Sequence, residues 1–194
     1  MVDYPKLKKR VIGIITDPMH EWRAIVSEPE DIASLYRNYI VPLAAIPAVA
    51  MFIGLGVVGV PFVRRFGILT SLSTAVLVYV RGLVAPIVAA VVIEQLAPKF
   101  KSSGSTVDAL KLVAYASTPM WVGGAIYVLL YLVALSVVPA LYAVYLFYIG
   151  LTPIMKTPAD NVVPFMVVSA ITLIVVNIAL TLLLWVFGLP AYGF

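Results

Sequence analysis

The sequence predicts an all-α integral membrane protein with five transmembrane helices and a short amphipathic cytoplasmic N-terminal helical region. Of its 194 residues, 63% are apolar and only 11% are charged, whereas soluble domains carry about 25% charged residues. Residues 112–155 include no charged side chain, and as one helix they would span about 66 Å, roughly twice the thickness of a bilayer core. We therefore expect two spans joined by a turn at residues 136–139, where a proline would break the helix.

The first 38 residues form the part of the chain expected to lie in water. Residues 1–38 hold twelve of the 22 charged residues, and residues 39–194 form the five-helix transmembrane domain. A basic cluster beside an apolar stripe at helical spacing indicates a helix lying on an anionic membrane surface. The alternative is a plain polar tail before the first span. The residues expected to contact the membrane surface are Lys8, Lys9, Arg10 and Trp22.

Local signals indicate where helices should begin. Asp17 and Pro18 suit the N-cap and the first position of a helix. Residues 27–30, with the sequence Ser-Glu-Pro-Glu, resemble a capping box in which the serine caps a helix and the second glutamate reaches back. Farther along the chain, Ser105 and Asp108 have the spacing that caps the third span.

The apolar segments contain a few residues that are unusual for a membrane helix. The first span includes two prolines, which predict a kink or a late start, and a G-x-G-x-x-G pattern at residues 54–59. That pattern binds dinucleotides only between a strand and a helix, so here it indicates close packing of helices through small residues. Arg81 interrupts the second span, and Asn177 lies at the centre of the fifth. The spans are expected at 39–60, at 71–96, in the two arms of 112–155, and at 162–188.

The distribution of basic residues predicts the orientation in the membrane. With the N-terminus in the cytoplasm, cytoplasmic segments carry ten of the thirteen Lys and Arg residues, and only Arg64 and Arg65 lie outside. The opposite orientation would violate the positive-inside rule. We therefore expect a multi-pass protein of the cell membrane with a cytoplasmic N-terminus and an external C-terminus.

Three segments and the order of the elements carry a family resemblance. The segments are TDPMHEWR at 16–23, YASTPM at 115–120 and LYAVYLFYIGL at 141–151, and a short N-terminal region precedes five spans. Together they resemble the Yip domain family, membrane proteins named for interacting with Ypt/Rab GTPases. The resemblance implies a five-helix bundle, frequent self-association and no established enzymatic activity. The compact chain is similar to prokaryotic members, so the small-GTPase partner of eukaryotic members is not carried over.

One candidate site lies within the membrane. An arginine at mid-span costs about 2.5–3.5 kcal/mol to insert, so it is expected to point into the bundle towards neutral partners, or alternatively to snorkel towards the outer surface. Held by neutral partners, it would suit an anionic ligand or a lipid phosphate. Tyrosines of the third and fourth spans line a cavity or pack between helices, and a proline breaks the third span or only kinks it. The candidate residues are Arg81, Tyr115, Pro119, Tyr145 and Asn177.

The sequence offers no catalytic, metal or cofactor site. Asp17, His20 and Glu21 have a spacing that could hold a metal, but His20 is the sole histidine and a helix cap is the simpler interpretation. The chain has no cysteine, and its spans include no aspartate or histidine for an intramembrane protease. There is also no P-loop or nucleic-acid-binding motif. We therefore expect no enzymatic activity, no cofactor and no nucleic-acid partner.

Two functions are compatible with these observations. The first is a non-enzymatic scaffold that self-associates and shapes or organises the bilayer, with a trafficking-like role and with anionic lipid as a partner. The second is a small permease, channel or lipid-handling protein with a polar site around Arg81. A sealed apolar bundle would favour the scaffold, and a cavity filled with water or lipid that reaches Arg81 would favour the permease.

Overall fold

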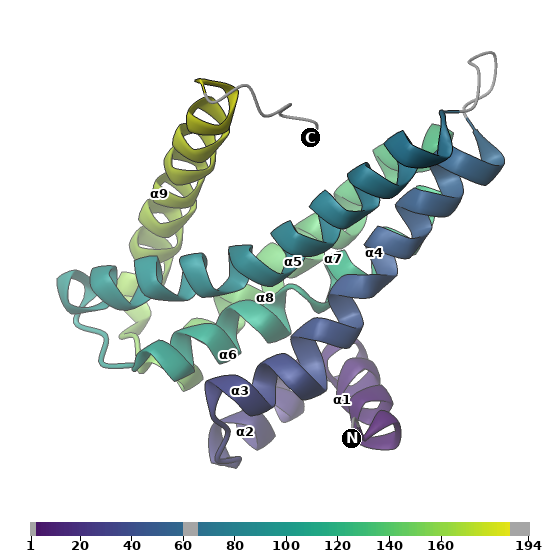
Figure 1. Cartoon of the computed structure of the whole chain (residues 1–194). Helices are drawn as coiled ribbons and strands as arrows, with labels where there is room; N and C mark the ends of the chain where they lie inside the picture. Colours follow the sequence, from purple (N-terminus) through teal and green to yellow (C-terminus); the bar gives the residue numbers. More distant parts are fainter. Residues whose placement is uncertain (1–2, 60–65, 187–194) are drawn as a thin grey trace.

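The computed structural model describes residues 3–59 and 66–186, with only the helical backbone for residue 177 and residues 179–186. Every regular element in these residues is a helix, as the sequence predicts. Four helical rods in the described part are long and apolar enough to cross a membrane. They are Ile32–Val58, Ile68–Phe100, Leu130–Met155 and Ala159–Val176. Figure 1 shows a shorter, broken helical segment, labelled α6 and α7, beside these rods, and two small helices near the N-terminus.

Two short helices begin the chain, α1 (Tyr4–Thr16) and α2 (Pro18–Ser27). Asp17 caps α2 by accepting a hydrogen bond from the backbone N–H of His20 at 3.3 Å, so the predicted helix start is confirmed. The predicted capping box at residues 27–30 is wrong, because α2 ends at its serine and the backbone is extended at the following residue. The cap of the next helix is Asp31, which accepts from the backbone N–H of Ser34 at 2.7 Å.

The first membrane rod begins seven residues before the predicted start at residue 39 and contains two π-helical turns. A π turn, in which Val41 N–H bonds to the carbonyl of Tyr36, directly precedes Pro42. Proline lacks the N–H and crowds the carbonyl of residue i−4, and a π turn accommodates both effects without ending the helix. The elements of this rod are α3 (Ile32–Leu35), η1 (Tyr36–Ile40), α4 (Val41–Ile53) and η2 (Gly54–Val58).

The second rod, α5 (Ile68–Leu96) followed by a 3₁₀ turn at Ala97–Phe100, packs along α4, and the two helices lie side by side in Figure 1. Small residues bring them together. A Cβ on Gly82 would lie 3.0 Å from the Cβ of Ala44. Close helix contact through small side chains is the usual means of association in lipid, where burial of apolar surface provides little driving force.

The predicted hairpin is present, but its turn lies elsewhere. The Ser105 capping box is confirmed, with both reciprocal hydrogen bonds formed. The chain reverses around Leu129, between two 3₁₀ segments, and not at residues 136–139, so that prediction is wrong. Pro139 lies in the first turn of a helix, where its missing N–H would have no intrahelical partner. The elements are α6 (Thr106–Ala116), α7 (Thr118–Gly123), η4 (Gly124–Val128), η5 (Leu130–Ser136) and α8 (Val137–Met155).

The first arm of this hairpin is not a continuous span. The helix is interrupted at Ser117, directly before Thr118 and Pro119, and it tightens to 3₁₀ geometry at Gly124. The sequence predicted a third span here and left open whether the proline breaks it or kinks it. The structure gives a break.

The last helix, α9 (Ala159–Val186), packs on the bundle through its N-terminal half. Phe165 of α9 stacks on Phe100 with 4.9 Å between the ring centroids. Farther along, the described side chains face outwards. These exposed residues are Ile171, Ile174, Val175 and Ile178. In Figure 1, α9 begins close to the C-terminal end of α5 and points away from the other helices.

The G-x-G-x-x-G segment packs a helix, as the sequence predicted. A Cβ on Gly54 would lie 2.0 Å from the carbonyl oxygen of Tyr127, so only glycine allows the first rod to contact η4. We expect Gly54→Ala to force the two backbones apart, at a cost of about 1–3 kcal/mol. That cost corresponds to a melting temperature about 3–10 °C lower for the detergent-solubilised protein.

Gly67→Ala is the matched control for this substitution, because a Cβ there has no heavy atom within 4 Å. Its melting temperature should fall by no more than about 3 °C, since alanine is a poorer N-cap than glycine but meets no steric clash at this position. Equal destabilisation by both substitutions would contradict the close contact at Gly54.

Candidate functional site

The most unusual group in the molecule is the guanidinium of Arg10, which is buried on α1 with only 8% of the residue exposed. It forms ion pairs with two carboxylates, donating to Glu21 from Nη1 at 2.5 Å and to Glu28 from Nη2. The guanidinium carbon also lies 5.8 Å from the centroid of the Tyr115 ring, within range of a cation–π contact. A buried charge is tolerated only when it is paired in this way.

The helix geometry brings these groups together. Arg10 lies one turn before Ile14, and these two residues form the buried face of α1. Gly13 leaves room for the partner helix, because a Cβ there would lie 2.3 Å from a carboxylate oxygen of Glu21. Asp17 and Pro18 then reverse the chain, so that α2 folds back against α1.

Arg10 and Glu28 each stabilise the charged form of the other. Burial alone would lower the pKa of Arg10, but the hydrogen bond to Glu28 and the neighbouring negative charges outweigh it and raise that pKa. Burial likewise opposes ionisation of Glu28, yet the hydrogen bond and charge of Arg10, with help from Lys6, lower the pKa of this carboxyl. Both groups are therefore held in their charged forms at neutral pH.

A second set of bonds connects the segment between α2 and α3 to α6. Lys111, which is also buried, donates from Nζ to the backbone carbonyl of Glu28 at 2.6 Å. One turn later on the same helix face, the hydroxyl of Tyr115 donates to the carboxylate of Glu30 at 3.0 Å. The N-terminal helices are thus attached to the helix bundle by charged and polar groups on both sides of Pro29.

Aromatic rings fill the space beneath these bonds. The Tyr115 ring meets Trp22 edge-on at 6.3 Å and lies 4.5 Å from Tyr39, centroid to centroid. The hydroxyl of Thr118 donates to the Tyr115 carbonyl at 2.7 Å, so the bond of 2.6 Å that joins Tyr39 and Thr118 is donated by Tyr39. The bond from Thr118 to Tyr115 lies at the break between α6 and α7, where it satisfies a carbonyl that Pro119, four residues later, cannot bond because it has no N–H.

Two of the four predicted membrane-surface contacts are wrong. Arg10 is paired inside the protein, and Trp22 is 1% exposed, with its ring facing Leu112 and Gly150. The reason is that the apolar stripes of α1 and α2 pack on the protein's own helices and not on lipid. Lys8 and Lys9 are exposed, as a surface contact requires.

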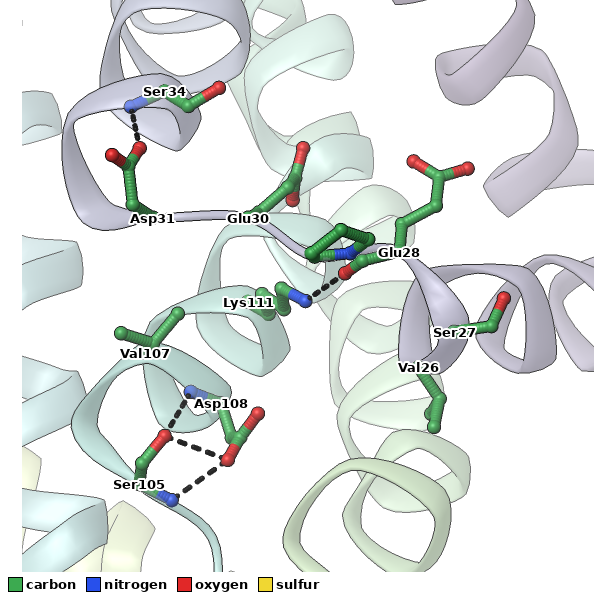
Figure 2. A pocket seen from close by; sticks show the side chains of 11 residues that line it. Val26, Ser27, Glu28, Glu30, Asp31, Ser34, Ser105, Val107, Asp108 and Lys111 are labelled. Carbon is green, nitrogen blue, oxygen red and sulfur yellow. Dashed lines mark hydrogen bonds between the residues drawn. The ribbon is translucent and has the colours of Figure 1, made fainter.

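An open cleft of about 890 Å³ lies beside this cluster, between the segment that follows α2 and the start of α6. Figure 2 shows that most of its polar groups bond to one another: Asp108 to Ser105, Asp31 to the backbone of Ser34, and Lys111 to the carbonyl of Glu28. Of these bonds, the one between Lys111 and Glu28 crosses the cleft and connects its two sides. Among the described residues no group of three or more His, Cys, Asp or Glu side chains could hold a metal ion.

The predicted intramembrane site does not assemble. Tyr115 and Pro119 are buried near the N-terminal helices, whereas Tyr145 is 45% exposed on α8, where it packs against Tyr142. Asn177 lies in α9, and its side chain is outside the described residues. The structure therefore separates the buried Tyr115 and Pro119 from the exposed Tyr145.

Arg81 is exposed on α5, so the expectation that it points into the bundle is wrong. The helix geometry gives the reason. The buried face of α5 includes Ala75, Pro86 and Ala90, and a residue five positions before Pro86 lies about 140° around the helix from it.

Sequence reasoning missed the residues that form the cluster around Arg10. The sequence pattern predicts a capping box at residues 27–30, and it indicates Lys111 only as one of the ten basic residues expected on the cytoplasmic side. One available signal was Lys111 itself, a single cation one helical turn before Tyr115 at the start of a long uncharged segment. The missed members are Glu21, Glu28, Glu30, Tyr39, Lys111 and Thr118.

Comparison with known proteins identifies the family that the sequence matches. A family model described as the Yip1 domain matches residues 12–191. The chain is 29% identical over 188 residues to a protein named inner membrane protein YohC from Escherichia coli K12, covering 92% of this chain and 96% of the relative. The protein of the same name from Escherichia coli O6:H1 matches equally well. No solved structure matches.

Removing Arg10 should release the N-terminal helices. Arg10→Ala leaves Glu21 and Glu28 without their shared partner. We expect a loss of about 3 kcal/mol, the lower end of the range for a broken buried ion pair, because both carboxylates keep some contact with water. The melting temperature should fall by about 6–12 °C, and chymotrypsin should cleave near Trp22 faster than in the parent.

Lys9→Ala is the matched control on the same helix, since Lys9 is exposed and makes no ion pair with a described carboxylate. It should change the melting temperature by no more than about a degree, as surface substitutions usually do. If Arg10→Ala behaves like Lys9→Ala in both assays, the buried ion pair does not hold the N-terminal helices.

Proposed function

Since the chain belongs to the Yip1 domain family, as the match over residues 12–191 shows, we propose that it is a non-enzymatic integral membrane protein. In this proposal it self-associates and organises the bilayer, in a membrane-shaping or trafficking-like role. Its N-terminal helices form a cap that faces the cytoplasm. Small-GTPase binding is not part of the proposal.

One observation carries this proposal: the membrane helices bury little of their surface within one chain. In the rod Leu130–Met155, only 6% of the most apolar window is buried, and in Ile68–Phe100 it is 22%. The outward side chains are apolar, and they include Val133, Leu141 and Val144. Such faces contact lipid or another copy of the chain.

The permease alternative is not favoured by the arrangement of its residues. It depended on a polar site that joined Arg81 to Tyr145 and Asn177, but Arg81 and Tyr145 lie exposed on different helices. The space between the described helices is filled instead by apolar and aromatic side chains, mostly alanine, leucine and isoleucine. These observations support a scaffold more than a transport pathway.

The proposal includes five crossings of the cell membrane, with the N-terminus in the cytoplasm and the C-terminus outside. Residues 106–128 would add a fifth crossing to the four rods, third in chain order, as a broken helix. At 1.5 Å per residue it would be about 35 Å long. The relative from Escherichia coli is named as an inner membrane protein, which supports the cell membrane as the location. The exposed Lys8 and Lys9 would face anionic lipid on the inner side.

Reporter fusions at both ends test this topology. Green fluorescent protein should fluoresce when fused to the N-terminus, and alkaline phosphatase should be active when fused to the C-terminus, because five crossings place the two ends on opposite sides. Four crossings would place both ends on one side. Finding both ends in the cytoplasm would therefore contradict the fifth crossing.

Self-association is tested by extracting the full chain with its surrounding lipid into polymer-bounded nanodiscs and weighing the particles. We expect two or more chains per disc at expression levels low enough that random co-capture is rare. A differently tagged, unrelated membrane protein expressed at the same level provides the control for co-capture. Single chains in nearly all discs would contradict the scaffold.

A further inference from the structure

A second pocket, of about 340 Å³, lies where α2 meets the end of α8 and the start of α9. Its volume is in the lower part of the range for small-molecule sites. Because α8 ends at Met155 and α9 begins at Ala159, two adjacent membrane rods terminate beside it. The pocket therefore lies at the depth where a bilayer changes from acyl chains to headgroups.

The wall of this pocket includes a polar group that the protein leaves unsatisfied. Trp22 lines the pocket, is 1% exposed, and its Nε1–H has no acceptor within the described part of the chain. A buried donor without a partner is costly, so such groups usually indicate a missing ligand or water. The hydroxyl-bearing residues Tyr148 and Thr152 line the same pocket.

The mouth of the pocket carries an uncompensated positive charge. Arg23 lines it and is exposed, and it makes no ion pair with any carboxylate that the structure describes. Arg10, on the neighbouring helix, differs because two carboxylates neutralise it. A free guanidinium presents a planar fork of donors that fits phosphate oxygens.

The remaining walls are apolar, and they continue into the membrane. Met19 and Val162 line the pocket. Tyr148 leads to Val144 one turn earlier on the same helix face, and both are exposed. An acyl chain that begins in the pocket could continue along this face of α8.

We propose that this pocket binds one anionic phospholipid, with the headgroup phosphate on Arg23 at the mouth and the first acyl carbons against Met19 and Val162. The proposal rests on the placement of α8 and α9 across the membrane, which belongs to the proposed function, and it does not require self-association. A zwitterionic choline headgroup would bring its own positive charge close to Arg23 and should bind less well.

Native mass spectrometry of the full chain in detergent, titrated with phosphatidylglycerol or phosphatidylcholine, tests the proposal. Arg23→Gln removes the charge at the mouth, and Ala159→Phe fills the pocket without a change of charge. Arg37→Gln is the matched control, because Arg37 is exposed but does not line the pocket. Inorganic phosphate is added in a separate arm to distinguish a lipid site from a simple anion site.

We expect one retained phosphatidylglycerol per chain, binding at least about tenfold weaker in Arg23→Gln, no retention in Ala159→Phe, and no change in Arg37→Gln. Equal binding of phosphatidylcholine, equal loss in both arginine variants, or full displacement by millimolar phosphate would each overturn the proposal. The same spectra count the chains in each particle, so a missing lipid and a missing oligomer are separate results.

Discussion

The buried guanidinium of Arg10 is the constraint on which the arrangement of the N-terminal helices depends. A charge removed from water must be paired, and the pairs it forms determine where α2 and the following segment can lie. Glu21 fixes α2 against α1, and Glu28 fixes the start of the segment that leads into the first membrane rod. Lys111 and Tyr115 then attach that segment to α6. The cap and the membrane helices form one body because of this chain of bonds.

Within the membrane helices the constraint is different. Lipid is itself apolar, so burying apolar surface between helices provides little driving force. Packing there depends on close approach, and glycines occur where helices come nearest. Gly54 lies against the backbone of Tyr127, and Gly150 lies against Leu112 and the ring of Trp22. The last contact joins the two parts of the molecule, since it places an aromatic ring of the N-terminal cap on the surface of α8.

Features that depend on nearby residues could be predicted from the sequence. The cap at Asp17, the capping box at Ser105 and the packing role of Gly54 each follow from a short pattern, and the structure confirms them. The position of the hairpin turn could not be predicted, because proline at position 139 is compatible with a helix start as well as with a turn.

Features that depend on residues far apart in the chain could not be predicted from the sequence. A helix with a basic face and an apolar stripe has the same pattern whether its stripe packs on lipid or on protein, so the burial of Arg10 and Trp22 could not be deduced. The partners of Arg10, which are Glu21 and Glu28, lie 11 and 18 positions along the chain, and Lys111 lies 83 positions from Glu28, so these groups become neighbours only through the fold. The outward position of Arg81 likewise depends on which face of α5 packs on α4.

The most direct test of this account is hydrogen–deuterium exchange of α1 and α2 in nanodiscs made only of phosphatidylcholine, with and without added phosphatidylglycerol. If the two helices are held by the protein, their amides should exchange slowly in both membranes, at rates like those of α6. Fast exchange in phosphatidylcholine that becomes slow only with anionic lipid would contradict the account, because it would mean that the membrane surface holds the helices.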